Sequence, residues 1–440
     1  MPISEGRLEP SEILAMNATA HAISPAKLFT TANPHALATI LEASETKRII
    51  ASRDIFDLNG IKLWGRDQPV SGALQRKLLD RQLRNPLETC LLAEDGVTAV
   101  QLVKATELLV ESDSPLAAWV RPHAARLVKE AAQMPLHSVV QLLLTAAQAS
   151  RPAAWQHALD AMVLSGALMA SHGGSGPEVR IAMLAGLTHD LGEVYIDPRH
   201  GEADAGRTLD FTSYQQLVVH PHVGQLLLSQ LTNYPASLAR AVGEHHERGD
   251  GSGYPHALRR DAISPLGRLL AVTEAALAVL RGDTPQLARV SVALRVVPGE
   301  FDLTWVGRIG EAVATQPPLS GRLELAQVQS RLTRLDAALQ VAQQTTMALQ
   351  PVAQTQPLKE ALNLTQHLLG RLRAGWYASG LWSADAVAAP DAAEVEAVED
   401  ELFVRLQAIS RAARLCAGAL QGADGGRLDE LCNALVVITP

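Results

Sequence analysis

Residues 245–255, with the sequence HHERGDGSGYP, are the part of the chain that most constrains its fold. Two adjacent histidines run directly into a segment of glycines and a proline, where the backbone must turn sharply. This composition suits neither the interior of a helix nor the alternation of a strand, so the packing of a regular element does not explain it. Since imidazole is a common metal ligand, the stretch predicts a loop that takes part in metal chemistry.

The composition narrows the class of protein. A chain of 440 residues has room for two or three domains. Alanine and leucine are abundant and aromatic residues make up 4%, which favours helices over sheets. A net charge of −8 without a basic block argues against a nucleic-acid polymer as partner. Cys90, Cys416 and Cys432 match no disulfide framework or zinc spacing, so we expect reduced thiols.

The first residues, MPISEGRLEP, have neither the basic nor the apolar region of a signal peptide. The sequence also contains no run of 18 uncharged apolar residues, so we expect no membrane span. Together these features predict a cytoplasmic protein.

The spacing of apolar residues predicts a mainly α fold with an uneven division of the chain. Residues 1–45 are expected to be a lead-in with short helices, and 46–105 a small α+β module. Helical spacing dominates 106–300, which predicts an all-α domain. In the module, Asn59-Gly60 between two apolar runs predicts a hairpin with a two-residue turn.

Long helical patterns resume over 301–440, with a loop expected at 383–393. We expect a C-terminal helical bundle. It would serve dimerisation or partner binding, or it would be a plain structural extension, and the sequence favours neither.

Histidines are concentrated in one region, since nine of the 14 lie between residues 157 and 256. Imidazole and carboxylate ligands suit iron, manganese or zinc. An Asp after a His at a helix end can bridge two ions, and such a pair can activate water and hold a phosphoryl group. The candidate metal ligands are His157, His189, Asp190, His220, His245, His246 and Glu274.

Each candidate has an ordinary structural explanation when it is taken alone. A histidine such as His157 is more often packed in a core, Asp190 could cap a helix near Gly192, and Glu274 could be a surface carboxylate. Adjacent histidines cannot share one face of a regular helix, so His245 and His246 could both face a metal only near a helix end. We expect four other histidines not to be ligands: His172, His200, His222 and His256.

Three segments together resemble the signature of a known family. They are HDLG at 189–192, HPHVG at 220–224, and HHERGDGSGYP at 245–255, with motif-loop residues Asp250, Gly251, Gly253, Tyr254 and Pro255. This pattern resembles the HD-GYP domain, a helical branch of the HD phosphohydrolases that hydrolyses cyclic di-GMP. The resemblance covers about residues 150–285. The spacing agrees as well: 32 residues separate His157 from His189, 31 lead on to His220, 25 to His245, and 28 separate His246 from Glu274.

The resemblance implies two divalent ions, iron or manganese. One would be held by His157, His189, Asp190 and Glu274, and Asp190 would bridge to a second held by His220, His245 and His246. A third ion in some family members needs a glutamate where this chain has Ala153. The family mechanism, attack by a metal-bridging hydroxide, would yield linear pGpG or GMP.

The chain departs from the family pattern at three places. Glu193 occupies the position of a lysine that meets the substrate phosphate, so this predicted catalytic position carries the opposite charge. Glu274 replaces an aspartate and is one methylene longer. In the family's basic stretch, only Arg281 and Arg289 remain as candidates for substrate binding, and Asp283 opposes them. Losing one charge-assisted bond to phosphate costs about 1.5–3 kcal/mol.

Three functions follow from this pattern. The leading hypothesis is a metal-dependent cyclic di-GMP phosphodiesterase in bacterial second-messenger signalling. The second is a catalytically impaired receptor or scaffold that binds metal, nucleotide or a signalling protein. The loop at 253–255, which serves partner contacts in the family, fits either of these two hypotheses. The third is a phosphohydrolase with a less anionic substrate.

Overall fold

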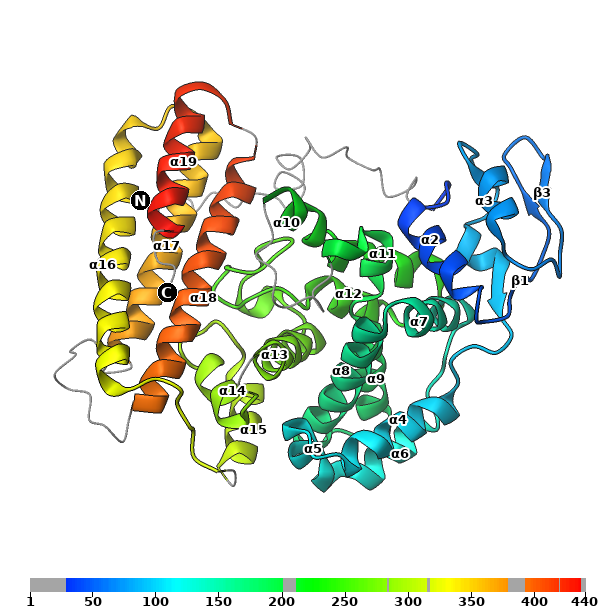
Figure 1. Ribbon diagram of the computed structural model, residues 1–440, viewed down its shortest axis with the longest axis horizontal. Helices are drawn as coiled ribbons and strands as arrows, with labels where there is room; N and C mark the ends of the chain where they lie inside the picture. Colours follow the sequence, from blue (N-terminus) through cyan, green and yellow to red (C-terminus); the bar gives the residue numbers. More distant parts are fainter. Residues whose placement is uncertain are drawn as a thin grey trace, which may run out of the picture.

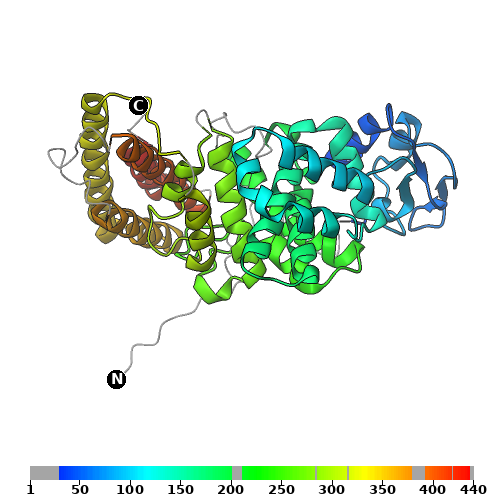
Figure 2. The ribbon, with the colours of Figure 1, turned by 90° about the horizontal axis from the view of Figure 1, so that it is seen from below.

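The computed structural model describes residues 29–200, 211–282, 285–314, 317–378, 392–418 and 420–436. Three parts lie in a row along the longest axis of the molecule (Figures 1 and 2). We call them the N-terminal module (29–93), the central domain (99–313) and the C-terminal bundle (325–436). Helices dominate, and the prediction of a mainly α fold is confirmed.

The N-terminal module contains the strands that the structure describes. Two small antiparallel sheets form, one from β1 and β4 and one from β2 and β3. In the first sheet, Ile50 of β1 lies opposite Leu92 of β4. The elements are α2 (Pro34–Ala43), β1 (Ile49–Ala51), β2 (Ile55–Phe56), β3 (Lys62–Trp64), α3 (Gly72–Leu78), η2 (Leu87–Cys90) and β4 (Leu91–Ala93).

The hairpin around Gly60 is present, but its turn is longer than predicted. Phe56 pairs with Lys62, so five residues connect the strands instead of two. The Asp57 carboxylate accepts hydrogen bonds from the backbone N–H groups of Asn59 (3.0 Å) and Ile61 (2.8 Å). This side chain stabilises a wider loop in which Gly60 has φ +83°. The prediction of a two-residue turn is wrong because it neglected Asp57.

The central domain is a set of helices around one apolar core. Its long helix α8 contacts both α9 and α13. Twelve of the 20 residues of α8 are buried, so α8 is a central helix. The elements are α4 (Ala99–Glu111), α5 (Pro115–Val120), η3 (Arg121–His123), α6 (Ala124–Ala131), α7 (Ser138–Ser150), α8 (Pro152–Ser171), α9 (Gly176–Thr188), η4 (Leu191–Tyr195), η5 (Pro198–His200), α10 (Phe211–Leu217), α11 (His220–Leu231), α12 (Ala236–Glu244), η6 (Arg260–Ala262), α13 (Pro265–Leu280), α14 (Leu287–Ala293) and α15 (Leu303–Val313).

The core of the central domain extends past the boundary expected at residue 300. Trp305, Val306 and Ile309 of α15 are buried in the same apolar cluster as α8 and α13. The helical pattern of α15 gave no indication of its partner, because its apolar face would fit either core.

The C-terminal bundle has a second core of its own. Its elements are α16 (Leu325–Leu349), η7 (Gln350–Val352), α17 (Gln356–Ala378), α18 (Ala392–Ala417) and α19 (Gly422–Val436). Val292, Val296 and Val297 of the central domain also belong to this core, which docks the bundle against α14. Most of the loop expected at 383–393 lies outside the described residues.

No helix in the described part of the chain combines the length and the apolar character needed to cross a membrane. All three cysteines are free thiols, as expected.

Candidate metal centre

The predicted ligands come from five different helices or helix ends. His157 lies on α8, His189 and Asp190 follow α9, His220 begins α11, His245 and His246 follow α12, and Glu274 lies on α13. As the sequence required, the two adjacent histidines sit at a helix end, where the chain leaves α12.

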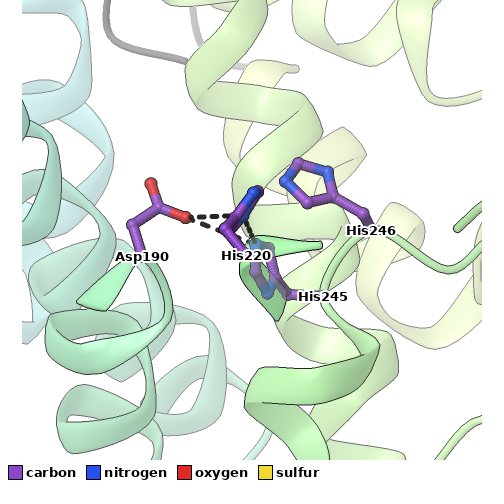
Figure 3. Close-up of side chains that lie close together, drawn as sticks. All are labelled: Asp190, His220, His245 and His246. Atoms are coloured by element: carbon purple, nitrogen blue, oxygen red, sulfur yellow. Dashed lines mark hydrogen bonds and ion pairs between the residues drawn. The ribbon is translucent and has the colours of Figure 1, made fainter. Parts of the chain in front are cut away.

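The structure brings these seven side chains into two clusters that share Asp190. One consists of His157, His189, Asp190 and Glu274; the other of Asp190, His220, His245 and His246. In each, one ligand atom per residue lies within 4.8 Å of the others. Figure 3 shows the second cluster, in which Asp190 faces His220 and His245.

Asp190 stands between the clusters with one carboxylate oxygen toward each. Its Oδ1 is 3.3 Å from the Nε2 atoms of both His220 and His245. Its Oδ2 is 3.3 Å from His157 Nε2 and 3.1 Å from His189 Nε2. A carboxylate in this position can serve two cations at once.

Backbone carbonyls set the orientation of three of the imidazoles. The Nδ1 atoms of His189, His220 and His245 lie 2.6–2.7 Å from the carbonyl oxygens of Gly186, Leu217 and Val242. A carbonyl only accepts, so each Nδ1 carries a proton and, in the neutral ring, each Nε2 presents a lone pair to the cluster. His220 Nε2 and His245 Nε2 are 3.1 Å apart, and two facing lone pairs at this distance need a cation between them.

The carboxylates of the clusters also fit a cation. Asp190 Oδ1 and Glu274 Oε2 are buried and face imidazole Nε2 atoms of the two clusters. Burial alone would raise the pKa of Asp190, but His189, His157 and His220 lower it well below its ordinary value. Burial and His246 lower the pKa of His245 to about 3, which leaves that ring neutral for metal binding. The residues present therefore suit two divalent ions.

Glu274 reaches the cluster despite its extra methylene. Its Oε2 is 2.8 Å from His157 Nε2 and 3.3 Å from His189 Nε2, while its Oε1 accepts a hydrogen bond from Arg281 (2.8 Å). Arg281 also donates to His157 Nδ1 at 2.7 Å. The guanidinium of Arg281, which we expected at the substrate, thus lies against two predicted metal ligands.

Gly192 allows the close approach of η4 to α11 that places Asp190 beside His220. A Cβ atom at Gly192 would lie 2.0 Å from the His220 carbonyl oxygen and 2.8 Å from the Gly224 nitrogen. Only glycine fits at this contact without moving the backbone.

The loop at 245–255 is held by its own carboxylates. Glu247 is buried and accepts hydrogen bonds from the backbone N–H groups of His256 (2.7 Å) and Leu258 (2.8 Å). Asp250 accepts from the backbone N–H and the hydroxyl of Ser252, and Gly251 has φ +86°. The Tyr254 ring stacks on the His246 ring with centroids 4.5 Å apart. The loop therefore orients one of the predicted ligands.

A cavity of about 580 Å³ opens beside the second cluster, with His246 in its wall. Its central-domain walls include Tyr214 of α10 and Tyr254 of the loop. Arg405 and Arg411 of α18 also line it, so the C-terminal bundle contributes to the wall. The volume is typical of a small-molecule site. The sequence contains no local signal for this contribution from the bundle, because α18 has an ordinary helical pattern.

Glu193, the predicted catalytic position, is buried near Arg151. Its side chain is 5% exposed and does not line this cavity. Its carbonyl oxygen accepts a hydrogen bond from Arg151 (2.8 Å), whose other amino group donates to Thr39 of α2. Burial lowers the pKa of Arg151, and the charge of Glu193 opposes this effect. The carboxylate of Glu193 thus compensates the charge of Arg151 in the interior.

Replacing Glu193 by lysine is therefore expected to destabilise the fold without raising activity. A buried lysine near Arg151 leaves two like charges uncompensated, which costs about 3–5 kcal/mol. Calorimetry should show a lower Tm for Glu193→Lys than for Glu193→Gln, which removes the charge alone. An unchanged Tm together with faster turnover would instead place residue 193 at the substrate.

Arg289 is the other arginine that we expected at the substrate, and the structure places it in a domain contact. Its guanidinium pairs with Glu396 (3.1 Å) and Asp400 (3.0 Å) of α18. Since both carboxylates come from a helix more than 100 residues away, the sequence gave no sign of this pairing. Asp283 lies outside the described residues.

Three of the four histidines expected not to be ligands have described side chains, and each of these packs against another ring. His172 packs on Trp305 with ring centroids 5.1 Å apart, and His222 packs on His256 at 6.0 Å. The side chain of His200 lies outside the described residues.

Comparison with known proteins agrees with this geometry. Residues 146–300 match the family model of the HD domain. The chain is 31% identical over 208 residues to the cyclic di-GMP phosphodiesterase PA4108 of Pseudomonas aeruginosa, a match that covers 47% of each chain. It is 35% identical over 101 residues to the cyclic di-GMP phosphodiesterase response regulator RpfG of Xanthomonas campestris, covering 23% of this chain and 26% of that protein.

A third relative is the 3′3′-cGAMP-specific phosphodiesterase 3 of Vibrio cholerae, 30% identical over 90 residues, which are 20% of this chain and 19% of that protein. The matches thus span about half the length of these curated relatives or less.

Proposed function

Because this chain contains an HD domain of the HD-GYP type, we propose that it is a metal-dependent phosphodiesterase that hydrolyses a 3′,5′-linked cyclic dinucleotide, with cyclic di-GMP as the leading substrate. The observation that carries the proposal is the pair of ligand clusters joined by Asp190. The names of the relatives support the substrate class, since two act on cyclic di-GMP and one on 3′3′-cGAMP.

In this proposal His157, His189, Asp190 and Glu274 hold one divalent ion and Asp190, His220, His245 and His246 hold the other. Two ions in this arrangement, iron or manganese, supply Lewis acidity toward the phosphodiester and an activated water. The protein orients the ligands: the carbonyls of Gly186, Leu217 and Val242 hold three imidazoles, and Arg281 holds Glu274. The cavity beside His246 gives a substrate access to the centre.

The test is a turnover assay on the full chain loaded with Mn²⁺ or, without oxygen, Fe²⁺. Cyclic di-GMP should be converted to linear pGpG or GMP, which chromatography separates, and 3′3′-cGAMP should be assayed in parallel. Chelation should abolish the reaction and added metal should restore it.

The second candidate is a receptor without catalysis, favoured by the absence of a lysine at residue 193. Bound metal and bound nucleotide with no product under either loading would reject the enzyme and support the receptor.

A partner role for the loop at 253–255 is a weaker proposal, because the bundle of the same chain already contacts the loop nearby. The Nε2 atom of His367 on α17 lies 3.1 Å from the carbonyl oxygen of Asp250. Dimerisation through the C-terminal helices likewise remains a proposal, which the molecular mass in solution would test.

A further inference from the structure

The cavity wall contains a continuous line of stacked side chains that leads from the metal centre to the C-terminal bundle. His246 stacks on Tyr254 at 4.5 Å, Tyr254 meets the edge of Tyr214 at 6.1 Å, and the Arg411 guanidinium lies 5.2 Å from the centre of the Tyr214 ring. All four residues line the cavity. The line therefore connects a predicted metal ligand with a cation on α18.

Arg411 differs from the other arginines of this cavity in having no acidic partner among the described residues. Arg405 is paired with Glu300 (3.3 Å) and with Glu401, and Arg248 lies 4.0 Å from Glu300. The charges of Arg405 and Arg248 are therefore balanced by neighbouring carboxylates in the cavity wall.

Within the described ranges, Arg411 has neither a carboxylate partner nor a hydrogen-bond acceptor, and its Nε atom is buried without a hydrogen bond. A guanidinium that is partly buried in a cavity and not neutralised favours an anion, and its planar donors match a phosphate.

The docking of the bundle keeps Arg411 in this position. Arg405 donates to the Ala293 carbonyl oxygen (3.1 Å), and Arg289 holds Glu396 and Asp400 from the other side. Val292, Val296 and Val297 of the central domain are buried in the bundle core. Apolar and ionic contacts thus hold α18 against the central domain, where it forms part of the cavity wall.

We propose that Arg411 binds a phosphate of the cyclic dinucleotide, while Tyr214 and Tyr254 provide aromatic surface for a base. This inference rests on the proposed function. The C-terminal bundle then supplies a phosphate-binding cation to this cavity from outside the HD domain. Aromatic side chains support bases by stacking, and an arginine that already lies over one ring is oriented for a phosphate beside it.

The test compares Arg411→Ala with Arg411→Lys and with Arg414→Ala in the full chain. Arg414 is a matched control, because it lies on the same helix and points toward Asp429 of α19 at 4.0 Å. Binding of cyclic di-GMP to the metal-loaded chain is measured by rapid mixing, before turnover consumes the ligand.

Arg411→Ala should weaken binding by about 10-fold to 100-fold, as expected for one charge-assisted contact to phosphate. Arg411→Lys should be intermediate, since it keeps the charge and loses the planar donors, and Arg414→Ala should bind like the unmodified chain. In the metal-loaded protein, Arg411→Ala should raise KM with little change in kcat.

Equal binding by the unmodified chain and Arg411→Ala, or no binding by the unmodified chain, would overturn this inference. Binding that depends on Arg411 without any turnover would uphold it and reject only the proposed catalysis.

Discussion

Asp190→Ala is expected to lose both metal ions and to reduce turnover by at least about 1,000-fold, which corresponds to about 4 kcal/mol. The reason is geometric. One carboxylate oxygen of Asp190 serves His220 and His245, and the other serves His157 and His189, so no single ligand is as important to both clusters. Removing a residue that merely supports a ligand costs about 10-fold to 100-fold in metal affinity, and a shared ligand should cost more.

Metal content by mass spectrometry and product formation by chromatography measure this effect. Asp261→Ala is a suitable control, because Asp261 is an exposed carboxylate of the same domain that pairs only loosely with Arg268 at 3.4 Å. An Asp190→Ala chain that retained two ions and activity would show that the clusters do not form the reaction centre.

Among substitutions that add a single methyl group to the site, Gly192→Ala should destabilise the protein most. The new Cβ would lie 2.0 Å from the His220 carbonyl oxygen, so η4 and α11 must move apart. Overpacking of this kind costs about 1–3 kcal/mol and occasionally more. The movement also separates Asp190 from His220 and His245, so metal binding at the second cluster should weaken together with stability.

Thermal unfolding and a metal titration of the same variant test this expectation. Gly370→Ala is the matched control, because Gly370 is an exposed residue of α17 and no atom lies within 4 Å of the position that the new methyl group would take. Alanine is favoured over glycine in a helix by about 1 kcal/mol, so the control should be neutral or slightly stabilised. A normal Tm and normal metal affinity for Gly192→Ala would contradict the tight contact between η4 and α11.

The local part of the fold and the ligand set could be predicted because their signals are local. Helical spacing of apolar residues predicted the all-α domain that contains α8, α11 and α13. The three motifs contain five of the seven side chains of the two clusters, and the spacing along the chain pointed to the other two, His157 and Glu274. The adjacency of His245 and His246 required a helix end, and α12 ends at Glu244.

The remaining features depend on contacts between distant parts of the chain. Arg289 looked like a phosphate ligand because of its position in the motif, whereas its partners Glu396 and Asp400 belong to another domain. The burial of Glu193 near Arg151 could not be predicted, because the sequence does not tell which way the side chain of a short turn points. Arg411 carried no signal, since a helical pattern does not reveal which surface of a bundle docks beside a cavity.

The most direct test of the paired metal centre is anomalous diffraction from crystals of the chain grown with Mn²⁺ or Fe²⁺. We predict two peaks about 3.5–4 Å apart, with one oxygen of Asp190 facing each. Glu274 and two imidazoles should surround one ion, and three imidazoles, His246 among them, should surround the other. A single peak, or two peaks that do not share Asp190, would contradict the paired centre.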